Sequence, residues 1–205
     1  MNILITAGPT YEYIDPVRFI SNPSSGKMGF AVAEAAKARG HNVLLISGPT
    51  NLKPPHRVEF ISVVSANEML KAVLEAYKYA NAVIMTAAVS DYMPIKVSKS
   101  KLKKGAKSLS LKLARTADIL STIGKKKGGR ILVGFALETD DMERNAIKKL
   151  KSKNLDYIIV NDPSSFGADT LYATILGRNG YRAVLKNITK NSLAKKIVGL
   201  VERQV

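Results

Sequence analysis

Short apolar runs alternate with stretches whose apolar residues recur every three or four positions, along nearly the whole chain. The short runs predict strands, and the longer stretches predict helices with one apolar face. Strands are expected at Asn2–Thr6, Asn42–Ser47, Val58–Val63, Ala82–Thr86, Leu109–Leu113, Arg130–Phe135 and Tyr157–Val160. Helices are expected over about Gly26–Arg39, from Ser65 onward, and over about Thr116–Ile123 and Met142–Lys151.

The helix that begins at Ser65 carries the clearest start signal. Glu68 follows Ser65 by three residues, so the two side chains can form a capping box. The apolar face of this helix consists of Met69, Val73, Ala76 and Tyr77. By contrast, Ala82–Thr86 is apolar throughout, which is typical of a buried parallel strand.

The pattern changes after Asp162. Leu171–Leu176 and Tyr181–Leu185 flank a segment containing Asn179-Gly180, a pair that favours a hairpin turn. A closing helix is predicted from the spacing of Leu193, Ile197, Leu200 and Val201.

The alternation predicts one doubly wound α/β domain over residues 1–205, with a mostly parallel, Rossmann-like sheet. A C-terminal hairpin in the region 163–188 and the closing helix are appended to it. Long loops are expected at residues 7–25 and 87–107. Ligands of such sheets lie beyond the carboxyl ends of the strands, where these loops gather.

Composition narrows the classes of protein. No apolar run approaches membrane-spanning length, and Met1 leads directly into a strand, so we expect no signal peptide, no membrane partner and a cytoplasmic location. The chain has no cysteine, which excludes thiolate metal sites. The net charge of +16 indicates anionic partners or a solvated lysine surface of the kind common in heat-adapted proteins.

The segment Thr6–Gly29 predicts an anion site, because a strand, a long polar loop and a helix N-terminus follow one another. Gly8 and Ser24 fit a phosphate-facing turn, although Ser24-Ser25-Gly26 could also be an ordinary helix cap. The loop lacks both the G-x-G-x-x-G and the G-x-x-x-x-G-K-[ST] pattern, so a dinucleotide enzyme and a Walker-type ATPase are disfavoured.

Two further segments carry candidate binding residues. Ala87 and Ala88 let a ligand lie against the backbone, and Asp91 could accept hydrogen bonds from a ribose or cap a turn. The ring of Phe135 could stack on a base or pack in the core. Lys149 and Lys153 share a helix face that could meet phosphates or solvent. His41 and His56 are interpreted as structural or solvated.

Several motifs resemble those of the phosphopantothenate–cysteine ligases, also called phosphopantothenoylcysteine synthetases. They span nearly the whole chain in the family's order. The matching segments are TAGPT at Thr6–Thr10, IDPVRFISN-x-SSGKMG at Ile14–Gly29, TAAVSDY at Thr86–Tyr92, SKLKK at Ser100–Lys104, GFALET at Gly134–Thr139 and KNLDYIIVND at Lys153–Asp162.

The resemblance implies a two-step ligation in coenzyme A biosynthesis. The carboxylate of 4′-phosphopantothenate attacks CTP, which is bound with Mg²⁺, and L-cysteine then displaces CMP from the acyl-cytidylate. Lys101 matches the loop lysine that serves the first step, Asn22 matches the asparagine that binds the intermediate, and Arg18 stands nearby in the motif. The residues that match nucleotide or acyl contacts are Met85, Thr86, Ala87, Ala88, Asp91, Ala117, Asp118, Ile119, Leu120, Phe135, Lys149 and Lys153.

The resemblance also concerns partners. It implies a homodimer, and we expect Leu171–Leu185 to meet the second subunit unless the hairpin folds back on its own domain. Family members are often fused to a phosphopantothenoylcysteine decarboxylase, and nothing in this sequence resembles that half.

The family commonly has proline at the position of Ala117. Its eukaryotic branch prefers ATP, whereas the lysine loop here resembles the CTP branch. The rival class, a nucleic-acid-binding protein, has only the charge in its favour.

Overall fold

A computed structural model describes residues 1–105, 108–137, 141–161 and 170–204. Its helices are α1 (Lys27–Ala38), α2 (Ala66–Tyr77), α3 (Ile119–Gly124), α4 (Met142–Ser152) and α5 (Lys190–Glu202). Its strands are β1 (Asn2–Ala7), β2 (Glu12–Tyr13), β3 (Phe19–Ile20), β4 (Asn42–Ser47), β5 (Glu59–Ser62), β6 (Ala82–Met85), β7 (Tyr92–Pro94), β8 (Leu113–Arg115), β9 (Ile131–Leu137), β10 (Tyr157–Asn161), β11 (Thr170–Gly177) and β12 (Arg182–Thr189).

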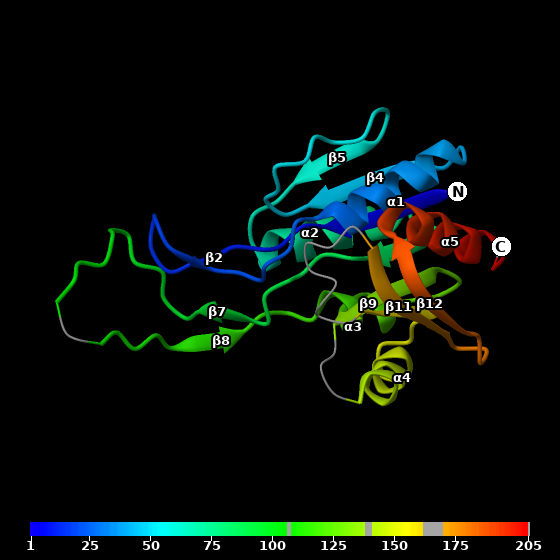
Figure 1. The fold of residues 1–205 in the computed structure, drawn as a ribbon. Helices are drawn as coiled ribbons and strands as arrows, with labels where there is room; N and C mark the ends of the chain where they lie inside the picture. Colours follow the sequence, from blue (N-terminus) through cyan, green and yellow to red (C-terminus); the bar gives the residue numbers. More distant parts are fainter. Residues whose placement is uncertain (106–107, 138–140, 162–169, 205) are drawn as a thin grey trace.

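The central sheet confirms the predicted doubly wound α/β class (Figure 1). Its eight strands lie in the order β12-β11-β10-β9-β6-β1-β4-β5. Six adjacent strands of this sheet are parallel, namely β10, β9, β6, β1, β4 and β5. Their order is that of a dinucleotide-type Rossmann sheet. The chain reverses its direction of winding between β1 and β6, which creates a crevice at the carboxyl ends of these two strands.

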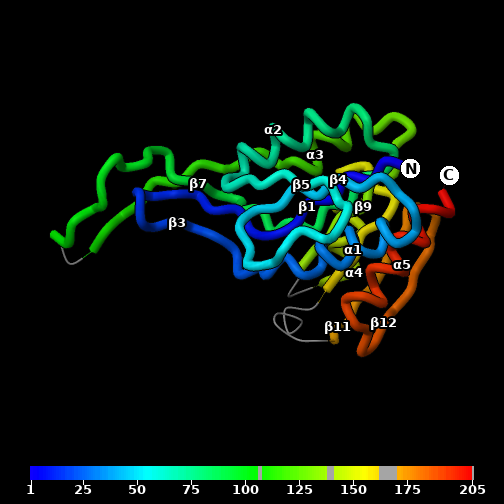
Figure 2. Tube along the Cα trace, turned by 90° about the horizontal axis from the view of Figure 1, so that it is seen from above, coloured from blue at the N-terminus to red at the C-terminus, as the bar shows by residue number. Residues whose placement is uncertain are grey.

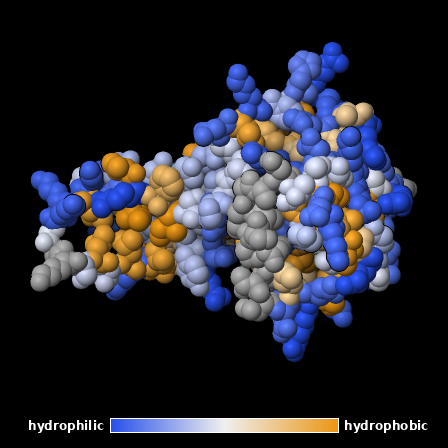
Figure 3. Space-filling model, viewed as in Figure 1, coloured by the Kyte–Doolittle hydropathy of each residue, from blue (hydrophilic) through white to orange (hydrophobic). Residues whose placement is uncertain are grey.

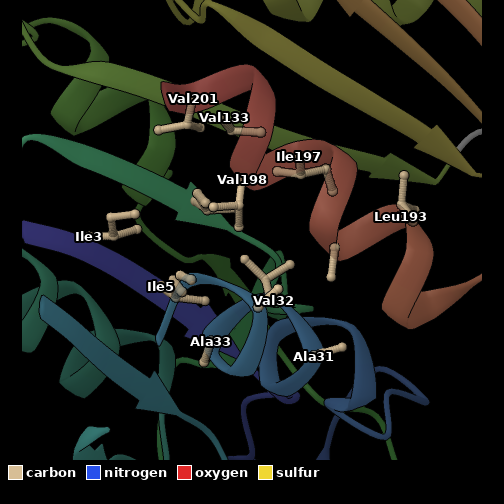
Figure 4. Close-up of a cluster of buried hydrophobic side chains, with 14 of the residues drawn as sticks. Ile3, Ile5, Ala31, Val32, Ala33, Val133, Leu193, Ile197, Val198 and Val201 are labelled. Carbon is tan, nitrogen blue, oxygen red and sulfur yellow. The ribbon is translucent and has the colours of Figure 1, made fainter. Parts of the chain in front are cut away.

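Helices cover both faces of this sheet. Figure 2 shows α2 and α3 on one side and α1 and α5 on the other. Ile5 of β1 packs against Val32 of α1 and Val198 of α5 in the core of the second side (Figure 4). The opposite core contains Leu4 and Met69, so successive residues of β1 serve opposite layers. This double burial explains why the predicted strands are apolar runs rather than alternating patterns.

Most predicted elements are confirmed to within one or two residues. The capping box of α2 forms as expected: the Ser65 hydroxyl accepts from the Glu68 N–H, and the Glu68 carboxylate accepts from the Val64 N–H. Three boundaries were wrong. The strand expected at Leu109–Leu113 occupies Leu113–Arg115 instead, and α3 begins only after Asp118, which is its N-cap. The strand expected at Tyr181–Leu185 runs from Arg182 to Thr189.

The C-terminal hairpin joins the sheet of its own domain, which is the alternative that the sequence left open beside packing of Leu171–Leu185 on a second subunit. The inner strand, β11, pairs antiparallel with β10, for example Ile175 with Ile159. Leu171, Ala173 and Ile175 join the core beneath α1 and α5. Hydrogen bonding to β10 and burial of these side chains supply the partner surface that a hairpin needs.

The two long loops contain short strands that form a projection, which we call the arm (residues 11–21, 91–105 and 108–116). In the arm, β2 pairs with β3 and β7 pairs with β8. Both backbone views show it extending away from the sheet (Figures 1 and 2). Its base is fixed to α2, since the buried Glu12 carboxylate accepts from the Ala66 N–H at 2.8 Å. The rings of Tyr11 and Phe19 stack along it, 3.9 Å apart between centroids.

The described helices are all too short or too polar to cross a membrane.

Candidate functional site

A cavity of about 840 Å³ opens at the carboxyl edge of the sheet, where the crevice between β1 and β6 begins. Its walls come from the start of α1, the segment after β6, α3, the end of β9 and α4. Fourteen predicted site residues line it: Asn22, Ser24, Met85, Thr86, Ala87, Ala88, Asp91, Ala117, Asp118, Ile119, Leu120, Phe135, Lys149 and Lys153. The fold therefore brings together residues that are up to 131 positions apart in the sequence, from Asn22 to Lys153.

The first wall is the N-terminus of α1. Gly26 is the N-cap, in a left-handed conformation with φ of 74°, and no side chain caps the helix. Ser24 accepts only a long 3.4 Å hydrogen bond from the Gly26 N–H. Gly29 packs so closely on β1 that an added Cβ would lie 2.5 Å from both Ala7 and Thr86. The helix end thus approaches the sheet edge closely and presents N–H groups suited to an anion.

The segment after β6 forms the floor. The Asn22 side-chain amide donates to the carbonyls of Ala88 (3.3 Å) and Val89 (3.1 Å), which joins the two long loops. Ala88 N–H donates to the carbonyl of Gly8 at 2.9 Å. Gly8, with φ of 72°, is therefore bonded to the floor but is not among the cavity-lining residues, and its contact with a phosphate stays a prediction.

The opposite wall is cationic and combines α3 with α4. The Lys153 ammonium lies 2.8 Å from Asp118, whose other carboxylate oxygen accepts from the Ser121 N–H and caps α3. Burial alone would raise the pKa of Asp118, but Lys153, the Ser121 N–H and Lys149 together hold that pKa below its ordinary value. Phe135 is half-buried: it packs against the core and also lines the cavity, so core packing is confirmed and stacking on a base stays a prediction.

Arg18 and Lys101, two of the three expected catalytic residues, do not line this cavity. Both belong to the arm. The Arg18 guanidinium binds the Asp15 carboxylate and the Leu102 carbonyl, and the catalytic role that the resemblance implies for Arg18 stays a prediction. Lys101 is exposed in the loop between β7 and β8. Glu138, Thr139, Asp162 and Lys107 lie outside the described residues.

Several polar or charged cavity-lining residues were not among the predicted site residues, including Lys27, Arg115, Asn161 and Lys190. Lys27 could have been found, since it directly follows the predicted anion loop. Asn161 ends β10 and so satisfies the rule that ligands lie at the carboxyl ends of strands. Arg115 and Lys190 carry no such signal, because β8 and the entry to α5 reach the cavity only through tertiary packing.

The two histidines are structural or solvated, as predicted. His41 is buried with its Nε2 atom 2.9 Å from Glu202, and His56 is exposed. Across the described ranges, no three His, Cys, Asp or Glu side chains are grouped to hold a metal ion.

The fold and the cavity define a doubly wound α/β protein with a ligand cleft at its topological switch point. The chain belongs to the family described as DNA/pantothenate metabolism flavoprotein C-terminal domain, whose family model matches residues 1–204. It is 48% identical over 202 residues to the coenzyme A biosynthesis bifunctional protein CoaBC of Bacillus subtilis (strain 168), covering 96% of this chain and 50% of that protein. The chain thus spans about half the length of the curated relatives it matches.

Solved structures agree with this assignment. The crystal structure of the C-terminal domain of a CoaBC bifunctional protein has a TM-score of 0.87 and 44% identity, covering 98% of this chain and 94% of that chain. A Cab2 variant in complex with phosphopantothenate-cysteine has a TM-score of 0.79, covering 99% of this chain and 87% of that one. At 18% identity, the second likeness shows a shared fold.

Proposed function

We propose that the chain is a phosphopantothenate–cysteine ligase that uses CTP and forms an acyl-cytidylate. The family, the bifunctional coenzyme A relatives and the neighbour named as a complex with phosphopantothenate-cysteine support this reaction class. The observation that carries the proposal is the cavity itself. It joins an uncapped helix N-terminus to a lysine-bearing wall, as a nucleoside triphosphate and a second phosphorylated substrate would require.

In the first step, a carboxylate oxygen of 4′-phosphopantothenate bonds to the α-phosphorus of CTP, and the bond to pyrophosphate breaks. In the second, the amine of L-cysteine bonds to the acyl carbon, CMP leaves with the electron pair, and the amine loses a proton. Neither step demands a nucleophile from the protein. The protein instead aligns three substrates and offsets phosphoryl charge, which suits a cavity lined by lysines, an amide and backbone N–H groups.

The residue roles follow from position. Lys149 and Lys153 stand opposite the α1 N-terminus and would hold the nucleotide between the two walls, with Phe135 beside it. Asn22, bonded to the segment after β6, would face the acyl group. Lys101 would be brought over the triphosphate by the arm. Because the described residues offer no metal-ligand cluster, Mg²⁺ would be held chiefly by the phosphates of CTP.

We expect CTP with Mg²⁺ to raise the melting temperature more than ATP, NADPH or short DNA does, because a ligand that binds only the folded state stabilises it. At a concentration of 100 times Kd the stabilisation is about 2.7 kcal/mol. Differential scanning fluorimetry with this panel measures the effect.

The matched variants for this panel are Lys153→Gln, in the cavity wall, and Lys96→Gln, in the arm. The first should lose most of the CTP-dependent shift, and the second should keep it. Equal shifts with every triphosphate would mean that the site reads only phosphate, and a shift with DNA alone would favour the nucleic-acid class.

We further propose a homodimer formed through the arm. Nine of the seventeen exposed large apolar residues in the described part of the chain belong to the arm: Tyr13, Val17, Phe19, Tyr92, Ile95, Val97, Leu109, Leu111 and Leu113. Figure 3 shows this apolar surface on one face of the arm. Two-stranded sheets this short are marginal without a partner surface. We favour a second copy of the chain as the partner, because Lys101 also lies on the arm. A dimer formed through the arm would therefore bring Lys101 to a nucleotide-binding cavity.

Ile95→Glu should therefore increase the fraction of monomer, because it places a charge in the apolar surface at a side chain that is 64% exposed. Light scattering at several concentrations measures the mass. Tyr79→Glu, at an exposed aromatic outside the arm, is the matched control and should leave the mass unchanged. A wild-type monomer with full ligase activity would contradict the dimer.

The relatives that span twice this length are bifunctional, and we propose that a phosphopantothenoylcysteine decarboxylase, associated or fused, receives the product. The cytoplasm, where CTP is made, is the proposed location.

A further inference from the structure

The most densely bonded carboxylate in the described structure lies in the arm, not in the cavity. Asp15 has a fully buried side chain. Its Oδ1 atom accepts from the N–H groups of Val17 and Arg18, both at 2.9 Å. Its Oδ2 atom accepts from Arg18 Nε at 2.9 Å and from the Leu102 N–H at 3.1 Å. Asp15 therefore connects two segments of the arm that are 87 residues apart in the sequence.

Arg18 completes this connection. Its guanidinium binds the Asp15 carboxylate and also donates from Nη2 to the Leu102 carbonyl at 2.8 Å. Both backbone hydrogen-bonding groups of Leu102 are thus engaged by the Asp15–Arg18 pair. The fork of an arginine suits this task, because its separate N–H groups can reach a carboxylate and a carbonyl at once.

Residues just before Leu102 are held as well. The Ser98 N–H donates to the Ile14 carbonyl at 2.9 Å, and the Ser98 hydroxyl donates to the Ser100 carbonyl at 2.6 Å. The backbone on both sides of Lys101 is therefore fixed, while the Lys101 side chain stays exposed. A loop that only filled space would not need a buried charged pair at this point.

We propose that Asp15 is a positioning residue for Lys101: with Arg18 it holds the backbone of Leu102 and so fixes the point from which the Lys101 ammonium reaches the triphosphate. The proposal rests on the role of Lys101 in the proposed function. Fixing the backbone in advance spares the enzyme the entropy of ordering this loop during each turnover, and misplacement by an ångström is costly in rate.

The test is a double-mutant cycle on the activation step, with Asp15→Asn, Lys101→Gln and the two combined in the full chain. Pyrophosphate release from CTP and 4′-phosphopantothenate is followed in single turnovers. Asp15→Asn should lower the rate constant about 10-fold or more while the KM for CTP changes little, because the cavity walls remain intact. In the Lys101→Gln background, Asp15→Asn should have almost no further effect.

Glu75→Gln, an amide substitution at an exposed carboxylate of α2, is the matched control and should release pyrophosphate at the wild-type rate. Because Asp15 is buried, Arg18→Lys serves as a second variant: it keeps the charge but loses the fork, and it should repeat the non-additive pattern. Brief trypsin digestion should cut more readily at Lys101–Lys104 in Asp15→Asn and in Arg18→Lys than in the wild type.

Effects of Asp15→Asn and Lys101→Gln that multiply would overturn the proposal, since Asp15 would then act independently of Lys101. So would an unchanged rate in Asp15→Asn. If Lys101→Gln itself released pyrophosphate at the wild-type rate, Lys101 would not serve the activation step. The proposed role of Lys101 and the positioning role of Asp15 would then both be wrong. The single and double variants therefore separate the two failures.

Discussion

Pyrophosphate release is expected to fall about 10²-fold or more in Lys101→Gln, while binding of CTP to the cavity persists. The ammonium would offset charge that develops on the triphosphate during the attack, and removal of one such contact typically costs this much. Glutamine is one atom shorter than lysine but keeps the ability to donate a hydrogen bond, so the loss reports chiefly on the charge. Rapid-quench measurement of pyrophosphate, with CTP binding measured separately by calorimetry, checks both parts.

Lys96→Gln is the control for this prediction, because it removes the same charge from an exposed position of the same arm. We expect wild-type rates from it, as most lysines of this loop are solvated. An equal loss in both variants would show that the arm acts only through its total charge, and Lys101 would then have no particular role.

The second large effect is expected in Asn22→Asp, which should release pyrophosphate but transfer the acyl group to cysteine at least about 10-fold more slowly. The wild-type amide donates to the carbonyls of Ala88 and Val89. A carboxylate cannot donate these bonds, and it would repel the anionic acyl-cytidylate. Release of pyrophosphate and of CMP, measured in one reaction, separates the two steps.

Asn51→Asp makes the same chemical change at an exposed loop residue and should leave both releases unaltered. If Asn22→Asp lost both releases to the same extent, Asn22 would serve the cavity as a whole, and its assignment to the intermediate would be wrong.

The sheet could be predicted from the sequence because its signals are local. Ala82–Met85 is buried on both faces and reads as an uninterrupted apolar run. Ser65 and Glu68 mark the start of α2, because the hydrogen bonds between them join residues only three positions apart. Ala87 could be found because it follows the carboxyl end of β6, whereas Lys153 was carried over from the family resemblance; both line the cavity.

The arm could not be predicted in this way. Strands of two or three residues, such as Glu12–Tyr13 and Tyr92–Pro94, are too short to show a period, and their pairing is set by contacts across the fold. The hydrogen bonds of Asp15 could not be predicted for the same reason, since its partner Leu102 lies 87 residues away in the sequence. The hairpin itself could be predicted from its local Asn-Gly turn, but its pairing with β10 could not, because that pairing joins segments with no shared local pattern.

The two ends of the described chain both lie far from the cleft, at the amino edge of the sheet (Figure 1). Asn2 opens β1, and Glu202 at the end of α5 binds Arg39 and His41, which precede β4. A peptide tag on either end would therefore leave the cavity and the arm open to solvent. If the protein were immobilised on a sensor through such a tag, its cavity and arm would face the solution. Binding of nucleotide and of a second copy of the chain could then both be measured on the same sensor surface.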